Sequence, residues 1–273
     1  RLAESERQER LTLLASSARW YLAAGDQRSA AKVYQQLAAE AQSASLRSQY
    51  AISAYDAMVA SGNVEQATAY LLAQAENVDL SAWPAQRWSD SVAIAEGAMR
   101  HDLARQLNDL WLQAIPDSPD GLQMRFRLQL AAGETEDAWE TGHRLLALQP
   151  NSAPLIKQMA QLAQWTNRPE IALDFWVAYL ALVTDDAVRE VAWRQAFALF
   201  NYDRGIALLN DTAASRSLTA EELEALVYAH EARGTAQQAE RWLRSYVTRV
   251  PSHRLAWSKL LQNLQNTQQP DVE

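Results

Sequence analysis

Apolar residues recur at intervals of three and four along most of the chain, as in the segments "LTLLASSARWYLAAG" and "EELEALVYAHEARG". This spacing places apolar side chains on one face of a helix, whereas a half-buried strand would alternate apolar and polar residues. Only eight Gly and eight Pro interrupt the 273 residues. The pattern therefore predicts an all-α protein built from amphipathic helices.

Small residues recur along the chain with a period close to 34. The members of this small-residue column are Ala30, Ala67, Ala104, Ala138, Ala172, Gly205 and Ala239. They are separated by 37, 37, 34, 34, 33 and 34 residues. A small side chain lets two helices cross closely, and a larger one would cost about 1–3 kcal/mol. We therefore expect each unit to be a helical hairpin whose second helix carries the small residue.

Each member of the column is preceded, five positions earlier, by a residue expected to form a turn. These positions hold Gly25, Gly62, Met99, Gly133, Asn167, Phe200 and Gly234. Gly and Asn tolerate the left-handed conformation that ends many helices. Because Met99 and Phe200 replace Gly, we interpret the third and sixth units as degenerate. Twelve positions after the column, Pro116, Pro150 and Pro251 predict the ends of second helices, since proline lacks a backbone donor.

The period, the hairpin, the small residue and the terminal proline together resemble the tetratricopeptide repeat. Trp88, which lies sixteen residues before Ala104, and Trp257, six after Pro251, stand where that family has its first-helix Trp. The resemblance implies an all-α, right-handed superhelical solenoid of about seven repeats and part of an eighth. Residues 1–273 would form this single domain, as a fragment of a longer repeat protein.

The two intervals of 37 residues exceed the usual period and indicate insertions. They predict loops at residues 41–46 and 76–81. At the other end of the chain, the segment that starts with Leu255 begins another first helix and then becomes polar. We expect both ends of the array to lack capping repeats.

Composition limits the classes of partner. The 25 Lys and Arg against 33 Asp and Glu give a formal net charge of −8, which disfavours nucleic acid. The longest apolar run, residues 175–183, falls short of the roughly 20 residues that a membrane-spanning helix needs. The absence of Cys excludes disulfides and thiolate metal sites, and it suits a chain exposed to an oxidising compartment.

Known catalytic motifs are missing from the sequence. There is no GxSxG, no phosphate-binding loop, no GxGxxG and no HExxH, since "HEARG" at His230 lacks the second histidine. The four histidines are well separated in the sequence, so they do not suggest a metal site. Asp185 and Asp186 follow Thr184 at a predicted helix start, where carboxylates favour the helix dipole. We expect no catalysis, no metal and no cofactor.

Ten Trp residues are a large number for this chain length, and aromatic faces commonly bind sugar rings or peptides. Four of them fall at repeat core positions: Trp88, Trp111, Trp176 and Trp257. The other six are less well explained: Trp20, Trp83, Trp139, Trp165, Trp193 and Trp242. Trp83 either packs beside the following Pro84 or stands exposed.

In tetratricopeptide repeats the first helices line a concave surface, so the resemblance implies a partner-binding face there. The corresponding positions are Arg127, Lys157, Gln161, Gln164, Trp165, Arg194, Glu224, Tyr228 and Glu231. This mixed polar and aromatic surface suits peptide or carbohydrate, and the alternative is a solvated face that binds nothing. The clamp for chaperone C-termini found in some members is disfavoured because the required positions lack Asn.

The stretch "LAQWTNRPEIALDFWVAYL", residues 162–180, resembles the repeats of the PelB family, the exporters of the bacterial Pel exopolysaccharide, which carry A-x-W-x-x-x-P-E-x-A-L-x-x-W arrangements. This resemblance implies a non-catalytic periplasmic scaffold within an outer-membrane-anchored exporter. Its partner would be a periplasmic polysaccharide deacetylase or hydrolase, and the scaffold would help to guide the polymer to the pore. An acidic chain would also attract a partly deacetylated, cationic polysaccharide.

Two other functions are compatible with the sequence. One is a generic repeat adaptor that binds a peptide or helix in another multiprotein assembly. The other is an enzyme with an unrecognised site. The partner itself and the flanking segments are not specified by these residues.

Overall fold

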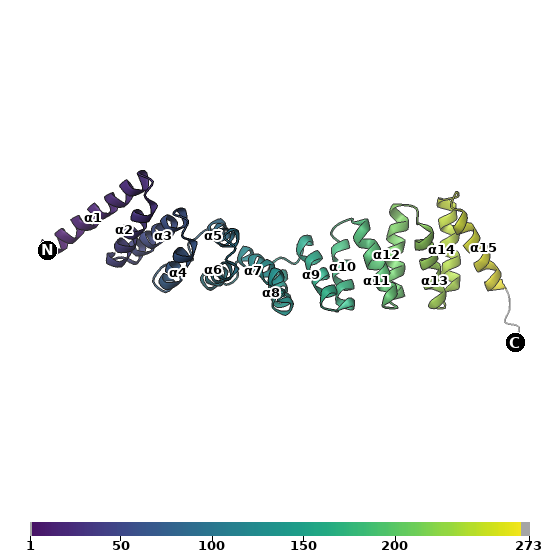
Figure 1. The fold of residues 1–273 in the computed structure, drawn as a ribbon. Helices are drawn as coiled ribbons and strands as arrows, with labels where there is room; N and C mark the ends of the chain where they lie inside the picture. The colour runs from purple at the N-terminus through teal and green to yellow at the C-terminus, as the bar shows by residue number, and fades with distance from the viewer. Residues whose placement is uncertain (1, 269–273) are drawn as a thin grey trace. The chain divides into compact units, whose positions relative to one another are not determined.

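The computed structural model describes residues 2–268, with side chains described for residues 6–265. Within these residues the regular structure consists of fifteen α-helices (Figure 1). The chain divides into two compact units, residues 1–149 and 150–273. The all-α prediction is therefore confirmed for the described residues.

Unit 1 contains four helical hairpins. Its helices are α1 (Leu2–Ala23), α2 (Gln27–Glu40), α3 (Ala44–Ala60), α4 (Val64–Gln74), α5 (Ala85–Gly97), α6 (His101–Ala114), α7 (Pro119–Ala132) and α8 (Thr135–Leu148). The two helices of every hairpin pack together, and α2 packs on α3 and α6 on α7 between hairpins. The first helices α5 and α7 also touch, as do the second helices α4 and α6. This is the stacking expected of an α-solenoid.

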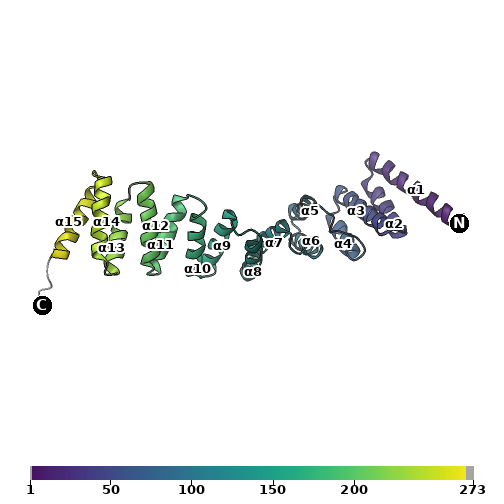
Figure 2. The same ribbon diagram turned by 180° about the vertical axis from the view of Figure 1, so that it is seen from behind.

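Unit 2 contains three further hairpins and one additional helix. Its helices are α9 (Ala153–Trp165), α10 (Pro169–Leu180), α11 (Asp186–Ala198), α12 (Tyr202–Ser215), α13 (Ala220–Ala232), α14 (Ala236–Arg249) and α15 (Arg254–Gln268). Each helix packs on the next, and α15 also contacts the first helix α13 (Figure 2). The additional helix α15 is thus placed as the first helix of an eighth repeat.

The small-residue column lies where paired helices cross. Its six alanines are at most 1% exposed, and Gly205 is also buried. A Cβ atom built on Gly205 would lie only 2.5 Å from the ring of Phe197, which leaves no space for a larger residue. The predicted role of the column is confirmed, because close packing tolerates little added volume.

All seven turn positions adopt the left-handed conformation, with φ between 56° and 80°. In each turn, the next residue donates its backbone N–H to the carbonyl five positions earlier, as Asn201 does to Ala196 at 2.8 Å. This bond is the signature of the Schellman motif. Met99 and Phe200 therefore replace Gly without changing the turn, although left-handed backbone costs a bulky residue about 1–2 kcal/mol. The third and sixth hairpins are degenerate in sequence but regular in structure.

The second helices end just before the predicted prolines, so Pro116, Pro150 and Pro251 are confirmed as helix terminators. The segment 76–81 is a loop, as expected. The predicted loop at 41–46 is wrong over its second half, because α3 already begins at Ala44. The hydroxyl of Ser43 accepts a hydrogen bond from the backbone N–H of Leu46 and so caps the helix early.

Three of the four Trp residues expected in the core are buried there: Trp88, Trp111 and Trp176. Trp83 is also buried, with its ring centroid 4.7 Å from that of Trp88, so it packs rather than standing exposed. Trp257 contradicts the expectation, since it is 44% exposed. It lies on α15, the last described helix, against which no further described hairpin packs.

Candidate functional site

The predicted partner-binding residues all lie on first helices of hairpins. Arg127 lies on α7 of unit 1, and the others belong to three consecutive first helices of unit 2. Lys157, Gln161, Gln164 and Trp165 lie on α9, Arg194 on α11, and Glu224, Tyr228 and Glu231 on α13. None of the nine is buried. Each can be placed by its contacts.

Lys157 on α9 reaches the residue that caps α11. Its Nζ lies 3.2 Å from Oδ2 of Asp185, which also accepts a hydrogen bond from the hydroxyl of Tyr179 at 3.2 Å. The other Asp185 oxygen accepts from the backbone N–H of Val188 and so caps α11. These bonds, led by that of Val188, lower the pKa of Asp185, and the carboxylate raises the pKa of Lys157. Asp185 is the predicted helix-start residue, and it joins two hairpins.

Other predicted residues also link successive first helices of unit 2. Gln164 on α9 donates to the side chain of Gln195 on α11 at 3.1 Å. Arg194 on α11 donates to Glu221 on α13 at 2.8 Å. Glu224 on α13 lies 3.6 Å from the ammonium group of Lys259 on α15.

In unit 1, Arg127 makes an equivalent link. Its guanidinium lies 2.6 Å from the carboxylate of Glu96 on the preceding first helix, α5. These polar links are exposed or half-buried ion pairs and amide contacts, each of which stabilises by at most about 1 kcal/mol. Much of the predicted binding set therefore serves the stacking of hairpins.

The remaining predicted residues are turned to solvent. Trp165, at the end of α9, is 69% exposed, and Tyr228 on α13 is 55% exposed. Glu231 lies three residues further along α13 and is also exposed, whereas Gln161 is half-buried. Exposed aromatic side chains of this size are common anchors in protein interfaces.

Sequence reasoning missed an aromatic group beside Tyr228. Phe200, in the α11–α12 turn, is 77% exposed, and its ring centroid lies 6.4 Å from that of Tyr202. The ring of Tyr202 lies 5.9 Å from that of Tyr228 at an interplanar angle of 80°. The Tyr228 hydroxyl raises the pKa of Tyr202. The available signal was a Phe at a turn position that favours Gly.

A hollow of about 360 Å³ adjoins this aromatic group. It is lined by Leu199, Phe200, Asn201, Tyr202, Asp203 and Arg233. Arg233 and Asp203 form an ion pair across it. The volume lies at the lower end of the range for ligand pockets, roughly 300–1,000 Å³, and suits one side chain or one ring.

A second, larger hollow lies in unit 1 between α3 and the loop that follows α4. Its volume is about 830 Å³, and hydroxyl, amide and carboxylate groups are prominent in its lining. Asp56, Glu76 and Asp79 line it together with one cation, Arg87, which is paired with Asp56. Hydrogen bonds from Ser81 lower the pKa of Asp79. The loop insertion at residues 76–81 thus helps to form an acidic hollow.

Net charge is unevenly divided between the units. Unit 1 has 13 Lys and Arg against 19 Asp and Glu, whereas unit 2 has 12 against 14. Among the described residues, no three His, Asp or Glu side chains converge as a metal site would require. None of the described helices combines the length and the apolar character needed to cross a bilayer.

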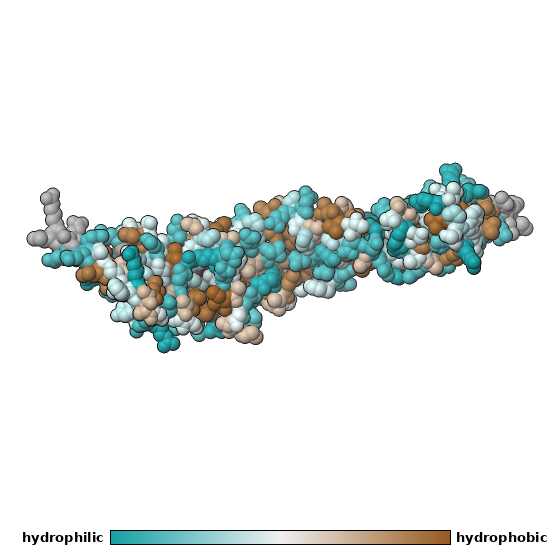
Figure 3. All heavy atoms as spheres, turned by 90° about the horizontal axis from the view of Figure 1, so that it is seen from above, coloured by the Kyte–Doolittle hydropathy of each residue, from teal (hydrophilic) through white to brown (hydrophobic). Residues whose placement is uncertain are grey.

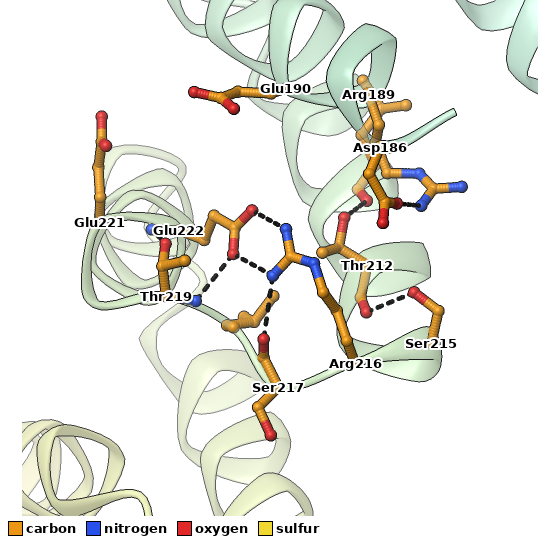
Figure 4. A network of polar contacts seen from close by, with 12 residues as sticks. Asp186, Arg189, Glu190, Thr212, Ser215, Arg216, Ser217, Thr219, Glu221 and Glu222 are labelled. Carbon is orange, nitrogen blue, oxygen red and sulfur yellow. Dashed lines mark hydrogen bonds and ion pairs between the residues drawn. The ribbon is translucent and has the colours of Figure 1, made fainter. Parts of the chain in front are cut away.

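The connection before α13 is held by a charged network (Figure 4). Arg216 forms a two-pronged ion pair with Glu222, at 2.6 and 2.8 Å. Glu222 also accepts from the backbone N–H of Thr219, whose hydroxyl in turn accepts from the backbone N–H of Glu222. Arg216 is the main cause that lowers the pKa of Glu222. This capping box fixes the start of the helix that carries Tyr228.

Apolar residues on the surface form small patches. On the face seen in Figure 3, brown patches are separated by polar residues. Scattered exposure of this kind is ordinary for a folded protein and does not by itself mark a site. The aromatic group around Phe200 differs from these patches because the rings of Phe200, Tyr202 and Tyr228 lie in successive contact.

No family model and no curated protein sequence matches this chain. Among solved structures, a chain of Naa15/Naa10 bound to HypK-THB matches with a TM-score of 0.50 and 15% identity, over 94% of this chain and 39% of that one. This chain therefore spans about two fifths of that neighbour's length.

Two tetratricopeptide repeat proteins are also similar. One from Parabacteroides merdae has a TM-score of 0.40 and 11% identity, covering 93% of this chain and 98% of its own. YrrB, described as having an unusual peptide-binding site, has a TM-score of 0.43 and 12% identity, covering 64% and 91%. Likeness at this identity concerns the fold alone, and the fold of the described residues is an all-α stack of helical hairpins.

Proposed function

We propose that this chain is part of a non-catalytic scaffold for the secretion of a Pel-type exopolysaccharide. The observation that carries the proposal is the hairpin at residues 162–180, whose sequence resembles PelB repeats. In that hairpin Ala172 and Trp176 are buried between helices, and Trp165 points to solvent. The motif therefore combines a structural core with an exposed aromatic side chain that a partner can cover.

The proposed protein partner is a periplasmic polysaccharide deacetylase or hydrolase. It would bind the first-helix face of unit 2, where Trp165 and Tyr228 are exposed. Buried aromatic anchors contribute much of the binding energy of protein interfaces. The polar links around them keep the three first helices in register, so that the anchors are presented on a preorganised surface.

The cationic polymer itself is a second proposed ligand. The excess of carboxylates in unit 1 and the acidic, hydroxyl-rich hollow beside α3 support contact with an amino-sugar chain. In this proposal the scaffold acts in the periplasm, as part of an exporter anchored in the outer membrane. Fractionation of cells that express the full-length protein tests the location.

The partner is tested by capture from a periplasmic extract of a bacterium that secretes such a polymer. We expect mass spectrometry to identify a polysaccharide deacetylase or hydrolase on the immobilised chain. The double variant Trp165→Ala with Tyr228→Ala should lose it. Trp20→Ala is the matched control, because Trp20 is an equally exposed Trp on α1 of unit 1. Recovery of no such enzyme, or equal recovery by the double variant, would overturn the proposal.

A generic adaptor for a peptide or helix is the alternative. The small hollow beside Phe200 favours it, because its volume matches a single anchoring side chain. Reproducible capture of an unrelated protein through Trp165 and Tyr228, without any carbohydrate-active enzyme, would select this alternative.

A further inference from the structure

Phe200 adopts a costly conformation without an obvious gain in packing. Its φ of 56° lies in the left-handed region, which disfavours a bulky side chain. Phe200 is also 77% exposed, so burial of its ring does not offset the cost of this backbone conformation. Four of the seven equivalent turns use Gly instead. Met99 shares this strain and exposure, but only Phe200 of the two lies in an aromatic group with Tyr202 and Tyr228.

The surroundings of Phe200 define what that ligand can be. Phe200 and Tyr202 line the small hollow, and Tyr228 lies against Tyr202. The remaining charged side chains in the lining, Asp203 and Arg233, already neutralise each other. The hollow thus places the Phe200 and Tyr202 rings beside polar groups, among them Asn201, and its two charges cancel.

Carboxylates follow one face of the neighbouring helix α13. Glu221, Glu224, Tyr228 and Glu231 are spaced by three, four and three residues, which places them on a single stripe. Arg194 and Lys259 neutralise the first two. Among the described residues, no cation pairs with Glu231, since the nearby Arg233 pairs with Asp203. A negative charge therefore remains one turn beyond the Tyr228 ring.

We propose that Phe200, Tyr228 and Glu231 bind a basic segment of the protein partner through its Arg or Lys side chains. Cations are attracted to aromatic faces within about 6 Å of the ring centre, and a guanidinium also stacks on them. The free Glu231 carboxylate supplies the opposite charge. This deepens the proposed function, because it gives the chemistry by which the partner enzyme is held.

A protein segment fits this site better than an amino sugar does. In this proposal the aliphatic stem of one Arg or Lys covers Leu199 and Phe200, and a neighbouring basic side chain of the same segment pairs with Glu231. The stripe spans eleven residues of α13, from Glu221 to Glu231, about 15 Å, which matches several successive side chains of an extended or helical segment.

The test uses a fluorescent ten-residue peptide of alternating Arg and Ser, with binding followed by anisotropy on the full chain. We expect Phe200→Gly, Tyr228→Ser and Glu231→Gln each to weaken binding about tenfold. Phe200→Gly should raise the melting temperature at the same time. Met99→Gly is the matched control, because Met99 has the same strained turn and similar exposure. It should raise the melting temperature and leave binding unchanged.

If Phe200→Gly raises the melting temperature but weakens peptide binding, the Phe200 ring serves a ligand and not the stability of the fold. Unchanged peptide affinity in Phe200→Gly and Glu231→Gln would overturn the inference, as would a lower melting temperature of Phe200→Gly. A glucosamine oligomer is titrated in parallel. If it binds and loses affinity in these variants while the peptide does not bind, the assignment to a protein segment is wrong.

The inference and the proposed function can fail separately. If Phe200→Gly and Glu231→Gln still capture the polysaccharide-modifying enzyme at the wild-type level, the inference fails and the scaffold proposal stands. If the wild-type chain binds the Arg peptide through Phe200 but captures no such enzyme, the scaffold proposal fails and the site stands.

Discussion

The guanidinium of Arg194 on α11 binds the carboxylate of Glu221 on α13, with Nη2 and Oε2 2.8 Å apart. Arg194 also pairs with Glu190 on its own helix. The two carboxylates, Glu221 foremost, raise the pKa of Arg194. Arg194, which the repeat offsets predict to contact a partner, therefore also links two consecutive hairpins.

Reversing this charge should lower stability. Arg194→Glu would place a third carboxylate beside Glu190 and Glu221, and we expect a loss of up to about 1 kcal/mol because the site is exposed. Urea unfolding at low and high salt measures it, and the loss should shrink in high salt. The exchanged pair Arg194→Glu with Glu221→Arg should recover much of the stability. If the double variant is no more stable than Arg194→Glu, the Arg194–Glu221 ion pair does not stabilise the contact between the two hairpins.

The small-residue column predicts a position-specific cost. Ala172→Leu would force the paired helices α9 and α10 apart, and we expect a loss of about 1–3 kcal/mol in the free energy of unfolding. Ala178→Leu is the matched control, since it makes the same change at an exposed position of α10. Chemical denaturation of both variants tests this. Equal effects at the two positions would show that the column is not a packing constraint.

The fold was predictable to the level of single turns because two residue properties repeat. Helices can approach closely only at Ala or Gly, as at Ala172, and a left-handed turn favours Gly, as at Gly133. Both signals are local and periodic. The start of α3 was missed because a single capping hydroxyl, that of Ser43, set it earlier than the repeat spacing suggested.

Replacing the residue at a strained left-handed turn with glycine should stabilise the protein. Replacing Met99 or Phe200 with Gly relieves about 1–2 kcal/mol of left-handed strain, and the greater freedom of glycine in the unfolded chain takes back about 0.4–1 kcal/mol. A net gain of roughly 0.5–1 kcal/mol is expected for each. Denaturation midpoints provide the measurement. Destabilisation by both variants would mean that their side chains contribute packing that outweighs the strain.

The Arg216–Glu222 ion pair predicts that the stability of the protein decreases in acid. The pKa of Glu222 is lower in the folded chain than in the unfolded one, chiefly because of Arg216. Its stabilisation is therefore fully present above the unfolded pKa of about 4.3 and is lost as the pH falls through the lower folded pKa.

Glu222→Gln should remove this contribution. We expect a loss of about 1–2 kcal/mol at pH 7, discounted because Arg216 is partly exposed, and a smaller difference from wild type at pH 3. Glu231→Gln is the control on the same helix, at an exposed carboxylate. A difference between Glu222→Gln and wild type that persists at pH 3 would argue that the loss comes from packing rather than charge.

The candidate site was predicted only in part. Repeat offsets located Trp165, Tyr228 and Glu231 correctly on first helices, because helix periodicity fixes which positions face the same side. They could not separate these residues from Lys157 or Arg194, whose ion pairs depend on neighbours about 30 residues away. Phe200 could not be predicted as a site residue, because a Phe in place of Gly departs from the repeat and no local pattern links it to Tyr202 and Tyr228.

Hydrogen exchange of the full chain, alone and bound to the captured enzyme, tests the central claim most directly. If the enzyme binds the first-helix face of unit 2, protection should increase in residues 197–203 and 221–232. Residues 95–101, which contain the equivalent turn of unit 1, should exchange as before. Enzyme binding that leaves 197–203 and 221–232 unprotected would contradict the account.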